Sequence, residues 1–158
     1  MKKLICLDGA RCGPWTMERL GVEDFVDWKS GLTQCIGLIE VAEDGTERQI
    51  AGVLFNEFNH ASIQMHVAAE PGARWMTKEY LGFCFRYPFV QCRVKKILGY
   101  VGSKNLQAQR FDTHLGFREE ARIVDAHQDG ELIIYSMTAD QCRWLNIPIP
   151  EEVMYGKR

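Results

Sequence analysis

The chain has 158 residues, of which 46% are hydrophobic and 25% charged, and its 19 basic and 21 acidic side chains leave a formal net charge of −2. These values are typical of a globular protein and exclude a disordered tail, a collagen-like repeat and a membrane-embedded protein. We expect one domain over residues 1–158. The slight acidic excess argues against a protein that coats nucleic acid, because such binding depends on many Lys and Arg contacts with phosphates.

The six cysteines are scattered along the chain, with no C-x-x-C pair and no His partner at zinc-finger spacing. We therefore expect reduced thiols in the core and no metal site. The apolar start at residues 1–7 is interrupted at once by Asp8 and Gly9, so it does not resemble a signal peptide. No apolar run approaches the ~18 residues that span a bilayer. Together these features predict a cytoplasmic protein with no membrane contact.

The first third of the chain has the weakest periodicity. Residues 4–7 indicate a short strand. A helix is expected to begin at Pro14, because proline suits the first helical position and Met17 and Leu20 follow three residues apart. A second helix is expected over residues 22–28, ending at Ser30 and Gly31.

From residue 32 the apolar residues alternate, which indicates strands. A first strand ends near Val41, and an Asp44-Gly45 hairpin turn connects it to a second strand at residues 49–58. A third strand covers residues 61–69. In the first of these strands the two faces are expected to carry Cys35, Gly37, Ile39 and Val41 on one side and Ile36, Leu38 and Glu40 on the other.

A long helix is predicted over residues 73–92, with Pro88 ending or kinking it. A strand at residues 96–101 precedes a short helix at residues 106–115, which Asn105 caps at its start and Gly116 at its end.

Two further strands at residues 118–125 and 131–138 enclose a turn, and a polar tail covers residues 139–158. The predicted class is α/β (α+β), with a mixed, largely antiparallel sheet and helices on both faces. A strand-helix-strand crossover supplies its central parallel pair.

A strand, a turn with glycine and a helix follow one another at residues 65–77. The start of a helix presents unpaired N–H groups and a partial positive charge, which suit a pyrophosphate. Arg74 and Lys78 add cationic side chains nearby. The alternative is an ordinary turn, since Pro-Gly before a helix needs no ligand.

Residues 102–117 place an asparagine just after a strand, then a short helix, then Leu-Gly-Phe leading into a strand. Together with residues 65–77 and the order of elements, this segment resembles the GNAT superfamily of acetyl-CoA-dependent N-acyltransferases. It looks most like the branch that acetylates ribosomal-protein N-termini. The stretch from Asn105 to Phe117 matches the N-x-x-[AS]-x-[RK]…L-G-F pattern of that family at every spacing.

The pyrophosphate loop of the family, [QR]-x-x-G-x-[GA], is matched less closely. Gly72 falls on its first glycine, but Arg74 occupies the second small position and Pro71 precedes Gly72. A small residue there lets the backbone approach phosphate closely. Arg74 therefore either binds phosphate itself or indicates a pocket that no longer holds coenzyme A.

The resemblance implies a fold in which the parallel pair splays around the cofactor. It also implies a set of cofactor contacts at the end of the first splayed strand and in the loop after it, namely Val67, Ala68, Gly72, Ala73, Arg74, Trp75 and Met76. Asn105 would meet the pantetheine arm, and Arg110 or Lys104 the phosphates. For Asn105 the alternative is a helix N-cap that needs no ligand.

Family members transfer the acetyl group by direct attack of an amine on the thioester, and many use a Tyr four residues before the Gly of L-G-F as the acid. This chain has Asp112 there, so the acid is missing or replaced. On the strand at residues 61–69, His66 lies on the polar face just before the proposed cofactor loop and is the candidate base. Glu57 and His60 are the runners-up. The alternative for His66 is a hydrogen-bonded structural histidine.

The function that this resemblance implies is N-acetyl transfer from acetyl-CoA to a primary amine on a protein N-terminus, a lysine or a small molecule, with no metal. The alternative is a GNAT-fold binding or regulatory module without turnover, motivated by Arg74 and Asp112. Transfer to nucleic acid is a remoter alternative that the charge balance opposes. The sequence identifies neither the acceptor nor the oligomeric state, monomer or homodimer.

Overall fold

The structure is a computed structural model that describes residues 1–149. Its strands are β1 (Lys2–Cys6), β2 (Gln34–Val41), β3 (Glu47–Asn56), β4 (Ser62–Ala69), β5 (Lys96–Gly102), β6 (Arg118–His127) and β7 (Gly130–Met137). Its α-helices are α1 (Gly9–Leu20), α2 (Lys78–Arg86) and α3 (Leu106–Leu115). The predicted strands agree with these apart from their ends.

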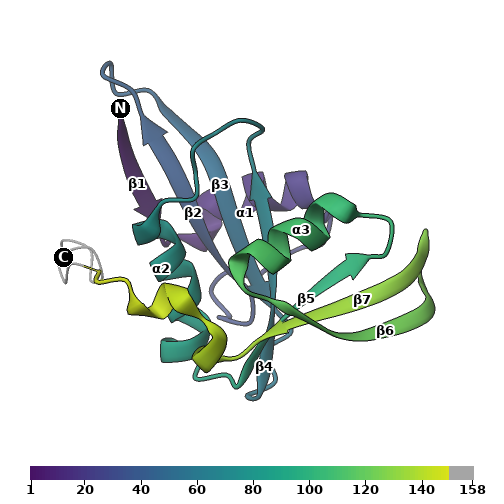
Figure 1. Cartoon of the computed structure of the whole chain (residues 1–158). Helices are drawn as coiled ribbons and strands as arrows, with labels where there is room; N and C mark the ends of the chain where they lie inside the picture. Colours follow the sequence, from purple (N-terminus) through teal and green to yellow (C-terminus); the bar gives the residue numbers. More distant parts are fainter. Residues whose placement is uncertain (150–158) are drawn as a thin grey trace.

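The strands form one sheet in the order β1-β2-β3-β4-β5-β7-β6. Among the strands of residues 1–149, only β4 and β5 pair in parallel, and every other neighbouring pair is antiparallel. The crossover from β4 to β5 passes through α2, and the hairpin of β6 and β7 curves away from the body of the molecule (Figure 1). The predicted mixed sheet with a central parallel pair is therefore confirmed.

Helices cover both faces of the sheet, with α1 on the far side and α2 and α3 on the near side in Figure 1. Ile36 and Leu38 of β2 belong to the larger core, together with α2 and α3, whereas Cys35 and Ile39 pack in the smaller core against α1. The predicted alternation of β2 is thus confirmed. Gly37 and Gly52 let α1 approach the sheet closely, since a Cβ on Gly37 would lie 2.6 Å from Cys12 Cβ and one on Gly52 would lie 1.9 Å from Thr16 Oγ1.

The prediction for the start of the chain is wrong in two respects. Helix α1 begins at Gly9 instead of Pro14, because the Asp8 side chain accepts a hydrogen bond from Ala10 N at 3.1 Å and acts as the N-cap. Pro14 therefore lies inside the helix. The second predicted helix, at residues 22–28, does not form: this segment belongs to the irregular connection between α1 and β2.

The long predicted helix at residues 73–92 is also wrong in its bounds. Residues 73–77 are not helical, and α2 begins at Lys78 because Thr77 is the N-cap and accepts a hydrogen bond from Tyr80 N at 3.2 Å. At the other end α2 gives way to a π-helical turn, Tyr87–Gln91, which contains Pro88. The predicted interruption at Pro88 is confirmed.

The predicted tail has structure in its described part. Two 3₁₀ turns, Ala139–Gln141 and Arg143–Asn146, follow β7. Trp144 Nε1 donates to Leu115 O at 2.8 Å, and its ring stacks on Phe85. Residues 150–158 of the predicted tail lie outside the described residues. No helix within residues 1–149 has the length and apolar character needed to cross a membrane.

Candidate functional site

Strands β4 and β5 are paired over only part of their length. They are paired only from Ser62 to Gln64, opposite Lys96 to Leu98, and beyond Gln64 the ladder between them ends. Two adjoining cavities of about 170 and 370 Å³ follow where the strands separate, and they share Val67, Ala108 and Phe111. We call this continuous opening the cleft.

The two parts of the cleft differ in their lining. The inner part is lined by Leu20, Met65, His66, Val67, Gly99, Tyr100, Val101, Ala108, Phe111 and Asp112. The outer part is lined by Val67, Ala69, Trp75, Asn105, Gln107, Ala108 and Phe111. The walls are mainly apolar with a few polar groups, which is the usual composition of a small-molecule site.

His66 enters the inner cleft from the α1 face of β4. Its neighbours along the strand, Ile63 and Met65, are buried in the larger core, so the predicted division of the two faces is confirmed. The His66 Nε2 atom lies 2.9 Å from Asn56 Oδ1, and with this partner Nε2 donates and Nδ1 is left as an acceptor. Burial lowers the pKa of His66, against the opposing effect of the Glu57 carboxylate, and favours the neutral imidazole.

The two alternatives to His66 lie further from the cleft. Glu57 follows the end of β3, is exposed, and lines a separate cavity on the α1 side. His60 is exposed in the turn between β3 and β4, and its ring packs against Phe58 with centroids 4.8 Å apart. Of the three, only His66 lines the cleft.

Asp112 reaches the inner cleft from α3. A Cβ placed on Gly99 would lie 3.4 Å from Asp112 Oδ2, so the carboxylate sits directly over β5 where the strands separate. Burial raises the pKa of Asp112 to about 6. This carboxyl group therefore carries a proton in part of the molecules near neutral pH, which an ordinary surface aspartate does not.

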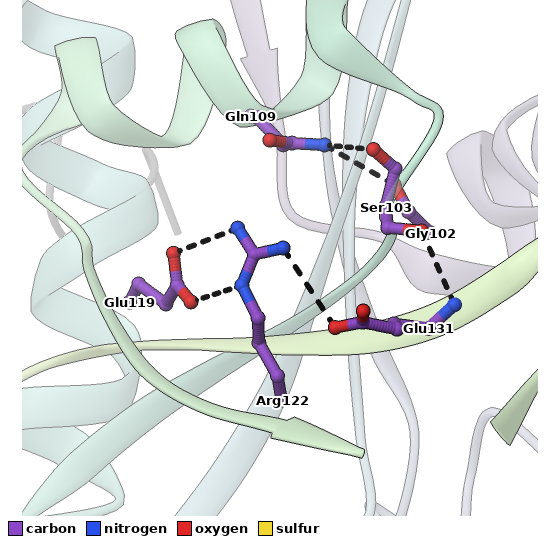
Figure 2. A network of polar contacts seen from close by, with 6 residues as sticks. All are labelled: Gly102, Ser103, Gln109, Glu119, Arg122 and Glu131. Atoms are coloured by element: carbon purple, nitrogen blue, oxygen red, sulfur yellow. Dashed lines mark hydrogen bonds and ion pairs between the residues drawn. The ribbon is translucent and has the colours of Figure 1, made fainter. Parts of the chain in front are cut away.

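Polar contacts hold the start of α3 against the ends of β5 and β7, as Figure 2 shows. Gln109 Nε2 donates to Ser103 O at 2.9 Å and to Gly102 O at 3.4 Å, and Ser103 Oγ accepts from Glu131 N at 3.1 Å. Arg122 of β6 pairs with Glu131 at 3.8 Å and also with Glu119. These contacts hold the start of α3 against the end of β5, and Ser103 connects it to β7.

Asn105 lies at this fixed N-terminus. Its Oδ1 accepts a hydrogen bond from Ala108 N at 3.1 Å, so the predicted N-cap is confirmed. Asn105 also lines the outer cleft, and its amide NH₂ group is not used by the cap. The side chain can therefore cap the helix with its oxygen while its nitrogen donates to a ligand carbonyl.

The loop before α2 contributes less than its motif predicts. Gly72 has φ 76°, but open space surrounds the position where its Cβ would be, so it serves the turn and not a close approach. Arg74 and Met76 are exposed, and Arg74 O accepts a hydrogen bond from Lys3. Trp75 is the residue of this loop that reaches the cleft, where its ring lies 5.7 Å from that of Phe111.

The other residues predicted to contact the cofactor lie in three different places. Val67 lines both parts of the cleft, whereas Ala68 is buried on the α1 face and Ala73 packs against the larger core. Arg110 lines a shallow hollow on the other side of α3, with Thr113 and Tyr135. The structure thus does not bring Arg110 together with Asn105.

Several lining residues were absent from the predicted set, chiefly Leu20, Ala69, Tyr100, Gln107 and Phe111. Phe111 and Gln107 are one helical turn apart and flank Ala108, the small residue of the family pattern, so the helical period could have found them. Leu20 and Tyr100 carried no such signal.

A second cavity, of about 380 Å³, lies on the α1 side beyond His66. It is lined by Met17, Val22, Asp24, Phe25, Val26, Leu32, Thr33, Leu54, Asn56, Glu57 and Phe58. We call it the α1-side cavity. Asn56 joins it to the cleft, because the same side chain lines this cavity and bonds His66. Four of these eleven residues, Val22, Asp24, Phe25 and Val26, belong to the segment that was expected to form a second helix.

Trp28 holds that segment in place. A Cβ on Gly13 of α1 would lie 2.2 Å from the Trp28 ring, and one on Gly9 would lie 2.7 Å from it. The indole therefore rests on the helix surface where two glycines leave space for it. This contact holds the connection between α1 and β2 against α1, although the connection itself is irregular.

No group of three or more His, Cys, Asp or Glu side chains within residues 1–149 is arranged to hold a metal ion. All six cysteines are free thiols. Burial raises the pKa of Cys6 to about 11, and the pKa of Cys84 is raised by the same cause, so these thiols are not activated nucleophiles.

No protein-family model matches this sequence, and no curated protein does. Solved structures do match. A chimera of the Vibrio cholerae spermidine N-acetyltransferase SpeG and hSSAT superposes with a TM-score of 0.67 at 14% identity, covering 92% of this chain and 100% of that one. SpeG from Vibrio cholerae in complex with CoA and spermine gives 0.65 at 14% identity, covering 91% and 98%.

The ribosomal-protein-S5-alanine acetyltransferase of Vibrio fischeri gives a TM-score of 0.57 at 12% identity, covering 71% of this chain and 64% of that one. At such identities the likeness establishes the fold. This chain therefore has the fold that these acetyltransferases share, with a mixed sheet opened between a parallel pair of strands.

Proposed function

We propose that this chain, which has the fold of the GNAT superfamily, is an N-acetyltransferase that moves an acetyl group from acetyl-CoA to a primary amine. The observation that carries the proposal is the opening between β4 and β5, into which His66 and Asp112 project from different elements. A base and an acid with shifted pKa values at one cleft are what amine acylation requires.

The cleft suits the pantetheine arm of coenzyme A. Its outer part has apolar walls from Val67, Trp75 and Phe111, and the Asn105 amide supports it by offering a donor to a carbonyl of the arm. For the pyrophosphate, the α2 N-terminus presents free N–H groups after Thr77, with the cationic Arg74 and Lys78 beside it. Lys104 is a better phosphate partner than Arg110, since Arg110 lies across α3 from the cleft.

In the proposed reaction His66 acts as the base. The amine nitrogen attacks the thioester carbon, Nδ1 of His66 takes the proton that the amine loses, directly or through water, and the C–S bond then breaks. Protonated Asp112 gives its proton to the departing thiolate, which leaves as the thiol. The neutral imidazole and the raised carboxyl pKa support these two roles. Glu57 favours the amine electrostatically instead of accepting its proton.

The α1-side cavity, which from here on we call the acceptor cavity, supports an amine that arrives as a cation. Asp24 and Glu57 are its charged side chains, and both are acidic. Phe25 is 94% exposed and Phe58 is 36% exposed beside them, so the rim offers aromatic faces as well as carboxylates. We propose an ammonium group on an apolar body as the acceptor, which includes lysine side chains and peptide N-termini as well as small amines.

Two measurements test the proposal. Calorimetric titration with acetyl-CoA should show saturable binding that weakens in Arg74→Glu, with Arg110→Glu as the control on the far side of α3. Release of free thiol from acetyl-CoA should depend on an added amine such as spermidine or a lysine-containing peptide. An absence of binding at millimolar acetyl-CoA contradicts the enzyme.

A binding module without turnover is the second candidate, and the replacement of the usual tyrosine by Asp112 is what favours it. In that case acetyl-CoA binds but no amine increases thiol release. We further propose one domain, because both cores pack on the same sheet, and a cytoplasmic location, which the six free thiols support.

A further inference from the structure

A third cavity, of about 250 Å³, lies on the α2 side of the sheet, away from the cleft. It is lined by Leu7, Gln34, Ile36, Phe83, Arg86, Tyr87, Val90 and Gln91. None of these residues lines the cleft or the acceptor cavity. The cavity lies beside the C-terminal half of α2, whereas the cleft lies at the other end of this helix. It is therefore a separate site.

The walls of this cavity are largely apolar and partly open to solvent. Ile36 and Phe83 form its buried side, and Leu7 and Val90 form its rim with 44% and 55% of their surface exposed. Exposed aliphatic side chains around a hollow are typical of a binding site and not of a sealed core. The volume is larger than an engineered cavity of ~150 Å³ that takes up benzene.

The polar groups of the cavity are rich in donors and carry one positive charge. Arg86 donates from a terminal nitrogen to Ile147 O at 3.1 Å, but its buried Nε has no partner in the described part of the chain. No carboxylate within residues 1–149 pairs with Arg86, and none lines the cavity. The amides of Gln34 and Gln91 also belong to the lining. Arg86 is half-buried and borders the cavity with no carboxylate beside it within residues 1–149, so this lining favours a negatively charged ligand.

The local backbone explains why these groups converge. Instead of continuing as an α-helix, residues Tyr87–Gln91 form a π-helical turn, closed by Cys92 N donating to Tyr87 O at 3.0 Å. The wider turn brings Tyr87, Val90 and Gln91 to the same cavity. Single π-helical turns within helices are rare and occur often at functional sites.

We propose that this cavity binds a small organic carboxylate with an apolar body. Arg86 would pair with the carboxylate, and the walls from Ile36 and Phe83 would bury the hydrocarbon. A free phosphate fits less well, because the cavity has one cation and no helix N-terminus. A neutral ligand would leave the guanidinium without its anion.

Phenylacetate is a suitable probe. 2-Phenylethanol is its uncharged counterpart, and inorganic phosphate is an anion that lacks an apolar group. We expect the full chain to bind phenylacetate saturably, with a Kd of about 1 mM or below, and the other two at least about tenfold more weakly. Amide chemical shifts measured by NMR should move at residues 86–91. Equal binding of 2-phenylethanol, or no binding of phenylacetate, overturns the proposal.

Two variants locate the site. Arg86→Gln should weaken phenylacetate binding about tenfold or more, whereas Arg93→Gln, at an exposed arginine beyond the cavity, should leave it within about twofold. Because Arg86→Gln also loses the bond to Ile147, Gln91→Glu is the second variant: it places a like charge at an exposed position and should weaken binding similarly. Unchanged affinity in both variants, or displacement of phenylacetate by coenzyme A, contradicts the site.

Discussion

The two sides of the site are built in different ways. On the cofactor side, the cleft is formed by regular elements, β4, β5 and α3, whose ends are fixed by local caps and by the polar contacts of Figure 2. On the acceptor side, the wall is the irregular connection between α1 and β2, which Trp28 pins to α1. The first is determined mainly by local signals, and the second by long-range packing of Val22, Val26 and Trp28 on α1 and the smaller core, so the two should respond differently to substitution.

His66 lines the cleft and contacts Asn56 of the acceptor cavity. Its removal should have the largest effect on turnover. If it is the base, His66→Ala should lower turnover about 10²–10⁴-fold with little change in acetyl-CoA affinity. Because burial lowers the pKa of His66, the wild-type rate should fall only on the acid side of its ordinary pKa, and the variant should lose this limb. His60→Ala, in the neighbouring turn, is the control. A retained pH profile in His66→Ala excludes the role.

Gly13→Ala tests the contact between α1 and the Trp28 ring on the acceptor side. The added methyl group would lie 2.2 Å from the Trp28 ring, so the indole must move. We expect a loss of about 1–3 kcal/mol in the free energy of unfolding and a raised KM for the amine, with acetyl-CoA affinity unchanged. Chemical denaturation and steady-state kinetics measure the two effects.

The double variant Gly13→Ala/Trp28→Leu sharpens this test. If the cost comes from the clash, the smaller leucine relieves it, and the combined loss of stability is less than the sum of the single losses. Additive losses would show that Gly13 and Trp28 act independently.

Asp112→Asn tests the carboxyl on the cofactor side. The pKa of Asp112 is about 6 in the folded chain and about 3.8 as the unperturbed reference, so the folded chain holds a proton that the unfolded chain has released. Stability is therefore lost as pH rises from about 4 through 6. The asparagine variant should be more stable than the wild type by about 1–2 kcal/mol at pH 7.5 and equal to it at pH 4, while turnover falls.

Thermal unfolding at the two pH values measures this difference. A variant that is less stable than the wild type at pH 7.5 would show that the ionised carboxylate is stabilised in the cleft, contrary to the effect of its burial.

Asn105 should give the smallest effect on stability and separates capping from binding. Asn105→Ala loses the cap, at about 1 kcal/mol, and also the donor to the cofactor. Asn105→Asp keeps a capping oxygen but loses the NH₂ group, so it should retain stability and still bind acetyl-CoA more weakly. Equal acetyl-CoA affinity in Asn105→Asp and wild type would leave Asn105 with the capping role alone.

Much of the cofactor side could be predicted from the sequence because its signals are local. Asn105 and Gly116 delimit α3, and α3 runs between them as Leu106–Leu115. The alternation around His66 correctly separated its face from that of Met65. The Asp112 position was also visible from the Leu-Gly-Phe pattern, but its raised pKa depends on burial over β5, which no sequence pattern contains.

Errors came where a local pattern had two physical readings. Pro14 suits a first helical position, but Asp8 provides a stronger start six residues earlier. Val22, Phe25 and Val26 are spaced as on a helix, yet they lie in an irregular segment and line a cavity. The apolar spacing at residues 73–77 suggested a helix, but Thr77 is the N-cap, so α2 starts after Trp75 instead of before it.

By itself the sequence determined the order of the strands along the chain, the caps of α3 and the polar face of β4, because these features depend on residues close in the chain. It also provided the resemblance from which acetyl transfer was proposed. Only the tertiary structure decided where β4 and β5 separate, which residues of α1 and α3 meet there, and that Arg86 borders a cavity of its own. The physical reason is that burial, and with it the raised pKa of Asp112 and the place of Arg86 at its cavity, arises from packing between segments far apart in the sequence.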